Sequence, residues 1–333
     1  MAVPLERATV IGDGAMGTVC ALLLAEHGTE VAVWSAFDDQ AQAFERDREN
    51  KRFLPGSRFP DSLHVTRDAE RAFAGSEMIV SAVPCQYTRS VWETIKSACP
   101  AGVPVVTVTK GIEIGTLLCA TEIIAELVGP VPLAALSGPS IASEVARGLP
   151  ATVVVASADS SVAEMAQQAF STRTFRVYTN DDLIGVELAG ATKNVIALAA
   201  GIVDGVGAGD NAKAALLTRG LVEITRLGVA MGAQAATFKG LAGIGDLVTT
   251  CISPSSRNRT AGERIGRGMS TADVIASTSS VIEGIPTTEG VLELAAESRV
   301  ETPITAAVSS VLHGKQSAPE AIETLMTRRL KRE

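Results

Sequence analysis

The chain has 333 residues, 46% of them hydrophobic and 20% charged, which excludes an intrinsically disordered chain. Acidic residues outnumber basic ones by 37 to 29, and the resulting charge of −8 argues against a nucleic-acid or anionic-membrane surface, which needs a basic stripe. A chain of this length predicts two domains, and its composition predicts small-molecule partners.

The N-terminal half alternates short β-rich runs with helical runs, which predicts an α/β, Rossmann-type, doubly wound parallel sheet. We expect strands at residues 8–11, 30–34, 78–83, 103–108, 133–136 and 151–156, and an added edge strand at 174–178. Helices are expected between them, for example at residues 17–26 and 88–97.

Near residue 184 the chain changes to Ala- and Leu-rich helical runs. We expect helices at residues 184–202, 211–231, 260–267, 272–277, 288–298 and 319–330. The pattern therefore predicts a dinucleotide-binding domain over residues 1–183 and an all-helical substrate domain over residues 184–333. Because interdomain clefts are common ligand sites, we expect the active site between them.

The first expected strand is followed by the turn Gly12-Asp13-Gly14-Ala15-Met16-Gly17, which opens the first expected helix. Gly12 permits the tight turn, Gly14 lets the backbone approach a pyrophosphate, and Gly17 lets the helix pack closely on the strand. The helix N-terminus offers free N–H groups and a positive dipole end. The order strand, turn, helix and second strand predicts a dinucleotide site.

The end of the second expected strand does not identify the dinucleotide. It reads Trp34-Ser35-Ala36-Phe37, without the acid that holds an NAD ribose and without an arginine for a 2′-phosphate. The first carboxylates after it are Asp38 and Asp39. The choice between NAD and NADP therefore stays open.

Cysteine usage is typical of a reduced, cytoplasmic protein. The five cysteines are an odd number, widely spaced and without a Cys-x-x-Cys pair, which predicts neither a disulfide framework nor a metal site. No signal peptide is visible, and no uninterrupted apolar run reaches the roughly 20 residues of a membrane span. We expect a cytoplasmic protein without membrane insertion.

The second half of the chain carries more specific motifs. They are Ser137-Gly138-Pro139-Ser140-Ile141-Ala142-Ser143-Glu144-Val145, the segment from Glu187 to Ala197, Gly240-Leu241-Ala242-Gly243-Ile244-Gly245-Asp246-Leu247, and Ser255-Ser256-Arg257-Asn258-Arg259. Together with Thr109-Lys110-Gly111-Ile112-Glu113, they closely resemble bacterial NAD(P)-dependent glycerol-3-phosphate dehydrogenase, in unbroken order from about Thr9 to about Arg328.

The resemblance implies reversible reduction of dihydroxyacetone phosphate to sn-glycerol 3-phosphate with NAD or NADP. That reaction is an entry to glycerophospholipid synthesis, and the family also implies a homodimer. It further implies substrate contacts from Gly138, Ser140 and Asn194. The implied cofactor contacts come from Gly12, Gly14, Ala15, Met16, Gly17, Phe53, Lys110, Ala142, Arg257, Val281 and Glu283.

Lys193 is the candidate general acid. Reduction of a ketone leaves a developing alkoxide, which needs a positioned proton donor or cation. Lys193 lies in an otherwise apolar helical run, where burial would depress its pKa, although a lysine that reaches out to solvent fits the same pattern. The resemblance favours the catalytic role.

Two further candidate catalytic residues, Lys110 and Asp246, follow from position. Lys110 comes directly after an expected strand, at the edge where such sheets bind ligands, and the resemblance places it where substrate and cofactor meet. Asp246 lies in a glycine-rich loop, where it can orient Lys193 or accept a hydrogen bond from the substrate. A helix cap is the competing interpretation, and the resemblance places Asp246 at the substrate.

Arg257 is the candidate ligand of the substrate phosphate, because its planar guanidinium can form two charge-assisted hydrogen bonds. Ser256 and Asn258 flank it and add neutral donors, and the loop before them is expected to feed a helix. A solvated arginine-rich loop is the alternative interpretation.

The departures from the family all lie on the cofactor side: Asp13, Ala15, Met16, Ala36 and Phe53. A carboxylate at Asp13 would repel a pyrophosphate unless it pointed away. Two other functions remain open at this point: another two-domain hydroxyacid-type dehydrogenase, and a non-catalytic nucleotide-binding sensor.

Overall fold

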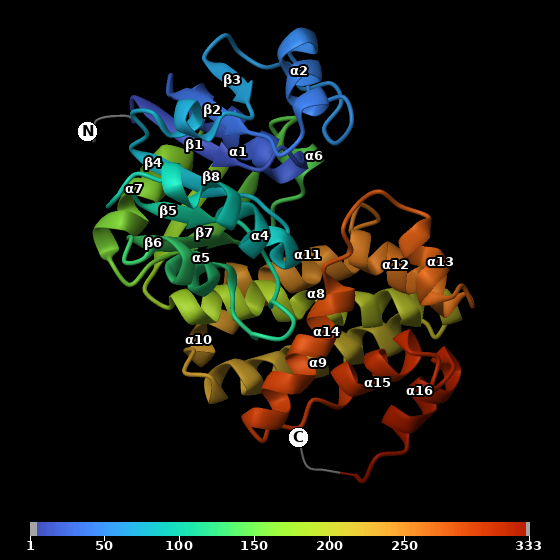
Figure 1. The fold of residues 1–333 in the computed structure, drawn as a ribbon. Helices are drawn as coiled ribbons and strands as arrows, with labels where there is room; N and C mark the ends of the chain where they lie inside the picture. The colour runs from blue at the N-terminus through green and yellow to red at the C-terminus, as the bar shows by residue number, and fades with distance from the viewer. Residues whose placement is uncertain (1–4, 331–333) are drawn as a thin grey trace. The chain divides into compact units, whose positions relative to one another are not determined.

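The computed structural model describes residues 5–330 (Figure 1). Their contacts divide them into two compact units. Unit 1 comprises residues 5–110 and Cys119–Val186, and unit 2 comprises Gly111–Leu118 and residues 187–330. The short segment Gly111–Leu118 thus belongs to unit 2, although the chain on either side of it belongs to unit 1.

Within the described residues, unit 1 contains an eight-stranded sheet in the order β3-β2-β1-β4-β5-β6-β7-β8. The strands are β1 Arg7–Ile11, β2 Glu30–Trp34, β3 Leu63–Thr66, β4 Met78–Ser81, β5 Val105–Thr107, β6 Leu133–Ser137, β7 Ala151–Ala156 and β8 Phe175–Asn180. All neighbouring strands pair in parallel except β6 and β7. The predicted doubly wound sheet is confirmed, with β8 at one edge and β3 at the other.

Two details of the sheet differ from the expectation. The expected strands do not include β3, because with only four residues its alternation of buried and accessible positions is too short to stand out. Strand β7 runs antiparallel to β6, because their connection holds only the four-residue helix α6, Ala142–Val145. A parallel return is usually made by a full helix that packs on the sheet, and α6 is too short for that.

Helices cover both faces of the sheet. They are α1 Ala15–Glu26, α2 Asp38–Asp47, α3 Ala69–Phe73, α4 Cys85–Ile95, the short 3-10 helix Lys96–Ala98, α5 Ala120–Val128 and α7 Ser160–Phe170. One apolar cluster joins a sheet face to α1, α2 and α7, and a second joins the opposite face to α3, α4 and α5. Burial on both faces explains why the central strands are continuously apolar.

Unit 2 is helical. Its elements are α8 Leu183–Val206, α9 Asp210–Ala230, α10 Ala235–Phe238, the π-turn Leu241–Gly245, α11 Asp246–Ile252, α12 Arg257–Gly266, α13 Thr271–Ala276, α14 Gly284–Glu297, α15 Pro303–Leu312 and α16 Ala318–Met326. Helix α8 begins in unit 1 and continues through unit 2. It is long and apolar enough to span a membrane, but its apolar window is completely buried, as in the core helix of a soluble protein.

Helices α8 and α12 lie backbone against backbone. A Cβ atom at Gly201 would lie 1.9 Å from the carbonyl oxygen of Arg259, and one at Gly262 would lie 2.1 Å from that of Leu198. Glycine is therefore required on both helices at this crossing. The close approach fixes the start of α12, where Arg257 and Asn258 lie, relative to the α8 residues Lys193 and Asn194.

Candidate functional site

The glycine turn follows β1 and packs against the end of β4. Gly12 has a φ of +105°, and a Cβ atom there would lie 2.9 Å from the carbonyl oxygen of Ala82. A Cβ atom at Gly17 would lie 2.0 Å from the carbonyl oxygen of Gly12. Both positions therefore require glycine, one for backbone conformation and the other for helix packing.

Gly14 has a different environment, because a Cβ atom there would meet nothing within 4 Å. It precedes the 12-residue helix α1, which begins with Ala15 and Met16 and has no acidic residue in its first turn. No side chain caps this helix. The start of α1 therefore has no capping side chain and lies beside a bare glycine with free space around it, an arrangement that fits a dinucleotide pyrophosphate.

The carboxylate of Asp13 is turned toward the end of β2. Ser35 Oγ donates a hydrogen bond to Asp13 Oδ2 over 2.5 Å. Burial raises the pKa of Asp13, and the Ser35 hydroxyl and the nearby Arg52 charge partly oppose that rise. The side chain is thus tied to the residue after β2 instead of to the first turn of α1.

Asn50 connects the glycine turn to the loop that carries Phe53. Its side-chain nitrogen donates to the carbonyl oxygen of Asp13 over 2.9 Å and to the hydroxyl of Thr18 over 2.8 Å. Its side-chain oxygen accepts the Phe53 N–H over 3.0 Å. Phe53, a candidate cofactor contact, is therefore fastened to the turn through a buried amide.

Lys110 and Ser140 meet at one carbonyl oxygen. Lys110 Nζ donates to the oxygen of Gly138 over 3.2 Å, and Ser140 Oγ donates to the same atom over 3.0 Å. Lys110 follows β5 and Gly138 follows β6, and these strands are parallel neighbours. Both loops therefore leave the sheet at its carboxyl edge, as does the glycine turn after β1, and Ala142 begins α6 just beyond them.

Lys193 and Asp246 form a buried ion pair in unit 2. Lys193 Nζ lies 3.2 Å from Asp246 Oδ1, and the two side chains are 6% and 4% exposed. Thr250 lies one turn after Asp246 on α11 and accepts a hydrogen bond from Lys193 Nζ over 2.7 Å. Its hydroxyl donates to the carbonyl oxygen of Asp246 over 2.6 Å.

Asp246 reaches Lys193 because of the irregular backbone before it. The π-turn Leu241–Gly245 precedes α11, and Gly243 within it has a non-helical ψ of −105°. A Cβ atom at Gly243 would lie 2.0 Å from the carbonyl oxygen of Phe238. Asp246 is the first residue of α11 and lies inside the unit, so it pairs with Lys193 and does not act as an exposed cap.

The thiol on the same helix as Asp246 is not activated. Cys251 is buried on α11, and burial raises the pKa of its thiol to about 12. The charge of Lys193 lowers that pKa, but by less than burial raises it. At neutral pH the group is therefore a neutral thiol and a poor nucleophile.

Asn194 follows Lys193 and belongs to a buried chain of hydrogen bonds. Asn258 Nδ2 donates to Asn194 Oδ1 over 2.9 Å, and Asn258 Oδ1 accepts the Gly284 N–H over 2.9 Å. Asn258 therefore uses both ends of its amide inside unit 2. Val281 and Glu283 lie in the segment that leads into α14 at Gly284.

Arg257 is the exposed first residue of α12, and Ser256 is the cap of that helix. Ser256 Oγ accepts the N–H of Arg259 over 3.2 Å, which leaves its hydroxyl proton for another acceptor. In the part of the chain that the structure describes, the Arg257 guanidinium makes no hydrogen bond or ion pair. An unpaired cation beside a helix N-terminus suits a phosphate.

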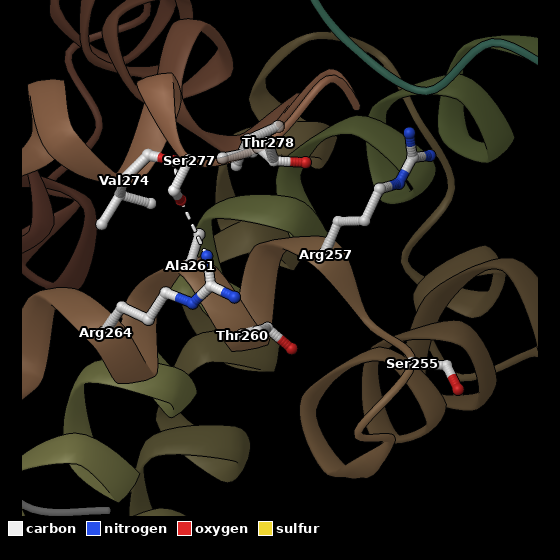
Figure 2. Close-up of a pocket in the computed structure, with 9 residues that line it drawn as sticks. Ser255, Arg257, Thr260, Ala261, Arg264, Val274, Ser277 and Thr278 are labelled. Atoms are coloured by element: carbon white, nitrogen blue, oxygen red, sulfur yellow. Dashed lines mark hydrogen bonds between the residues drawn. The ribbon is translucent and has the colours of Figure 1, made fainter. Parts of the chain in front are cut away.

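Arg257 also borders a pocket of about 190 Å³. Figure 2 shows the side chains of Arg257 and Arg264 pointing in different directions from α12. Arg264 Nη1 donates to Ser277 Oγ over 2.8 Å and is held against α13. Of these two arginines, Arg257 is therefore the one without a protein partner.

Three positioning residues were missing from the sequence interpretation: Thr250, Asn50 and Ser35. Thr250 could have been found from the sequence, because it lies four residues after Asp246 and therefore on the same face of the helix. Asn50 and Ser35 had none, since their partners are distant in sequence and their loops have no recognisable motif.

Two family models match nearly the whole chain. The NAD-dependent glycerol-3-phosphate dehydrogenase N-terminus matches residues 7–163, and the C-terminus of the same family matches residues 182–323. Glycerol-3-phosphate dehydrogenase [NAD(P)+] of Pelodictyon phaeoclathratiforme is 48% identical over 97% of this chain and 98% of its own. The protein of that name from Geobacter sulfurreducens is 46% identical over 98% and 99%.

Solved structures agree. The crystal structure of glycerol-3-phosphate dehydrogenase from Coxiella burnetii has a TM-score of 0.93 at 38% identity and covers 97% of this chain and 99% of its own. A D-mandelate dehydrogenase structure with NADH is also similar, at 11% identity and a TM-score of 0.63 over 95% and 99% of the two chains. That second likeness concerns the fold alone.

Proposed function

The chain belongs to the NAD-dependent glycerol-3-phosphate dehydrogenase family, and on this premise we propose how its residues divide the work of the reaction. It is an oxidoreductase that uses NAD or NADP to interconvert dihydroxyacetone phosphate and sn-glycerol 3-phosphate. Unit 1 serves as the dinucleotide-binding domain and unit 2 as the substrate domain. The observation that carries the assignment of roles is the buried cluster of Lys193, Asp246 and Thr250.

Lys193 acts as the general acid of the reduction. The reduced nicotinamide supplies a hydride to C2 of the substrate when the cofactor is bound. Lys193 gives a proton to the carbonyl oxygen as negative charge develops there, and the C=O bond becomes a C–OH group. In the reverse direction the neutral amine takes the proton back.

Asp246 and Thr250 hold the lysine ready for that step. An ammonium group carries three protons, and Thr250 and Asp246 engage two directions around Nζ. A proton donor that is already fixed loses little entropy when the substrate binds, and this lowers the barrier to proton transfer. The carboxylate of Asp246 also balances the positive charge of the buried ammonium group.

Arg257 binds the phosphate of the substrate, and Ser256 and the N-terminus of α12 assist. The guanidinium is exposed and unpaired in the described residues, so it can bind a phosphate without first breaking a contact with another protein group. Asn258 acts differently from the direct contact expected, because its buried amide positions Asn194, the substrate contact that we propose beside Lys193.

In unit 1, Lys110, Gly138 and Ser140 line the substrate end of the cofactor site. Gly12, Gly14, Ala15, Met16 and Gly17 hold the pyrophosphate. Phe53, Ala142, Val281, Glu283, Lys110 and Arg257 are the further cofactor contacts that we propose. The open backbone at Gly14 and the uncapped start of α1 support this assignment.

We further propose that the protein is a cytoplasmic homodimer whose product supplies glycerophospholipid synthesis. All five cysteines are free thiols, which fits a reducing compartment. Helix α9 exposes Val222 and Val229, apolar side chains that a second copy could cover. Light scattering of the purified chain tests the dimer, and a monomer at micromolar concentration contradicts it.

A substrate comparison tests the reaction itself. The purified chain is mixed with NADH or NADPH and either dihydroxyacetone phosphate or a 2-oxo acid of similar size. We expect oxidation of the reduced cofactor with dihydroxyacetone phosphate and none with the acid. The opposite preference would indicate a hydroxyacid-type dehydrogenase, and cofactor binding without any turnover would indicate a sensor.

A further inference from the structure

The glycine turn carries a carboxylate that a pyrophosphate site does not need. We propose that Asp13, held by Ser35, recognises the adenosine ribose and selects the dinucleotide that lacks a 2′-phosphate. This inference rests on the proposed role of the glycine turn, and it assigns this chain a preference for NAD over NADP.

The geometry places the carboxylate at the end of β2. That strand ends at Trp34, and Ser35 is the next residue, completely buried. Ser35 Oγ donates to Asp13 Oδ2 over 2.5 Å. In the described part of the chain, Ser35 is the one side chain that forms a hydrogen bond with this carboxylate. The carboxylate is therefore directed at the end of β2, and its oxygens can still accept further hydrogen bonds.

The end of β2 is where a Rossmann site reads the ribose. Enzymes of this fold that use NAD hold the 2′-hydroxyl with an acid at that position. Here β2 continues into Ser35-Ala36-Phe37 and supplies no acid itself. Asp13 therefore brings from the glycine turn the carboxylate that the strand lacks. A carboxylate accepts a hydrogen bond from a 2′-hydroxyl and repels a 2′-phosphate.

The cations near this end do not reverse the preference. Arg67 is paired with Asp38 over 2.7 Å. The Arg52 guanidinium lies over the Phe53 ring, 4.8 Å from its centroid, and its charge acts on Asp13. As long as Asp13 is present, each of these two arginines has an acid close to it, and a 2′-phosphate would have to compete with that acid.

Phe37 adds an apolar surface at the same end. It follows Ser35 by two residues, and its N–H donates to Ser35 Oγ over 3.2 Å. Its side chain is 60% exposed, which is unusual for a large aromatic residue in a chain with so few. An exposed ring beside a ribose-binding carboxylate is suited to stack on an adenine.

The test uses two fragments that differ only in the 2′-phosphate. Binding of ADP and of 2′-phospho-ADP to the full chain is measured by isothermal titration calorimetry, which requires no turnover. We expect the wild-type chain to bind ADP at least about tenfold more tightly, since a charge-assisted hydrogen bond contributes about that factor. Asp13→Asn should lower the ratio by about tenfold or more, because Arg52 is then released for the phosphate.

Two further variants sharpen the result. Asp39→Asn removes an exposed acid four residues beyond Ser35 and should leave the ratio unchanged. Ser35→Ala keeps the carboxylate but removes its tether, and should reduce selectivity less than Asp13→Asn does. Equal binding of the two fragments by the wild-type chain, or an unchanged ratio in Asp13→Asn, would overturn the inference. Binding of neither fragment would overturn the proposed pyrophosphate site itself, and this inference with it.

Discussion

Lys193 Nζ and Asp246 Oδ1 lie 3.2 Å apart in a place where both side chains are almost completely buried. Two charges without water around them are costly unless each satisfies the other and additional hydrogen bonds complete both groups. Thr250 Oγ1 accepts a hydrogen bond from Lys193 Nζ over 2.7 Å and lies within hydrogen-bond distance, 3.2 Å, of Asp246 Oδ1. Because the arrangement is costly for stability alone, its presence supports the catalytic role that we propose for Lys193.

Replacing the lysine should slow the chemical step strongly and leave substrate binding largely intact. We expect Lys193→Met to lower kcat by about 10²- to 10⁴-fold, the range typical of a general acid, with a much smaller change in KM. Steady-state kinetics with dihydroxyacetone phosphate measures this. Lys315→Met, at an exposed position, is the control and should retain activity. A variant of Lys193 with full kcat would exclude it as the acid.

The same replacement leaves Asp246 buried without its partner, and this should reduce stability. We expect Lys193→Met or Asp246→Asn alone to cost about 3–5 kcal/mol of unfolding free energy. The double variant should recover a large part of that loss, because it removes both charges. Urea denaturation gives these values. A double variant that is folded but inactive separates the catalytic effect from the structural one. Losses of unfolding free energy that simply add in the double variant would show that the two charges do not interact.

Thr250 should act through Lys193. Thr250→Val keeps the shape of the side chain but removes the hydroxyl that contacts Lys193 Nζ, so we expect a lower kcat and a shifted pH profile of kcat. The unfolding free energy should fall by about 1–3 kcal/mol, because buried polar groups lose a partner. Thr249→Val is the matched control, since the Thr249 hydroxyl bonds only the Gly245 carbonyl within the described residues. An unchanged pH profile in Thr250→Val would make Thr250 purely structural.

Arg257 should affect binding rather than chemistry. We expect Arg257→Ala to raise KM for dihydroxyacetone phosphate by about tenfold or more, the factor expected for a lost charge-assisted contact to phosphate. The kcat should change less. Arg257→Lys should restore binding only in part, because an ammonium group lacks the planar fork. Arg264→Ala is the control in the same pocket, and an equal effect there would remove the special role of Arg257.

Stability should depend on pH through a buried thiol. Burial raises the pKa of Cys20 to about 12. Below the ordinary thiol pKa of about 8.5, both the folded and the unfolded state hold the proton, and the full stability is present. Above that value the unfolded state loses its proton first, so the unfolding free energy should fall by up to about 1.4 kcal/mol per pH unit.

The variant Cys20→Ala isolates that contribution. It lacks the thiol, so its unfolding free energy should fall less steeply than that of the wild-type chain between about pH 7.5 and about pH 9.5. Urea denaturation at the two pH values measures the difference. If the unfolding free energies of variant and wild type differed by the same amount at both pH values, Cys20 would not carry the raised pKa.

Much of the fold was predictable because its signals are local. Strands β2 and β7 were expected at their observed bounds, and the long apolar helix α8 was placed by its composition. The direction of β7 and the existence of β3 depend on which strands pair, and pairing is decided by contacts far apart in the sequence. That residues 111–118 belong to unit 2 could not be predicted for the same reason, because it too depends on contacts between residues far apart in the sequence.

In the candidate site, too, the residues in local motifs could be predicted and the long-range contacts could not. Lys193, Asp246 and Arg257 stand in recognisable motifs, so the sequence could nominate them. The hydrogen bond between Asp13 and Ser35 could not be predicted, because it joins two loops that are distant in sequence and Ser35 belongs to no recognisable motif. The sequence raised the question of where the Asp13 carboxylate points, and the structure answers that it points to the end of β2.

We expect this chain to reduce dihydroxyacetone phosphate by means of Lys193. The most direct measurement is the rate of NADH and NADPH oxidation by the purified wild-type chain with saturating dihydroxyacetone phosphate, beside the folded double variant Lys193→Met/Asp246→Asn. We predict turnover by the wild-type chain with at least one of the two cofactors, and a loss of at least about 10²-fold in the variant. A folded wild-type chain that binds ADP but oxidises neither cofactor, or a variant as active as the wild type, would contradict the account.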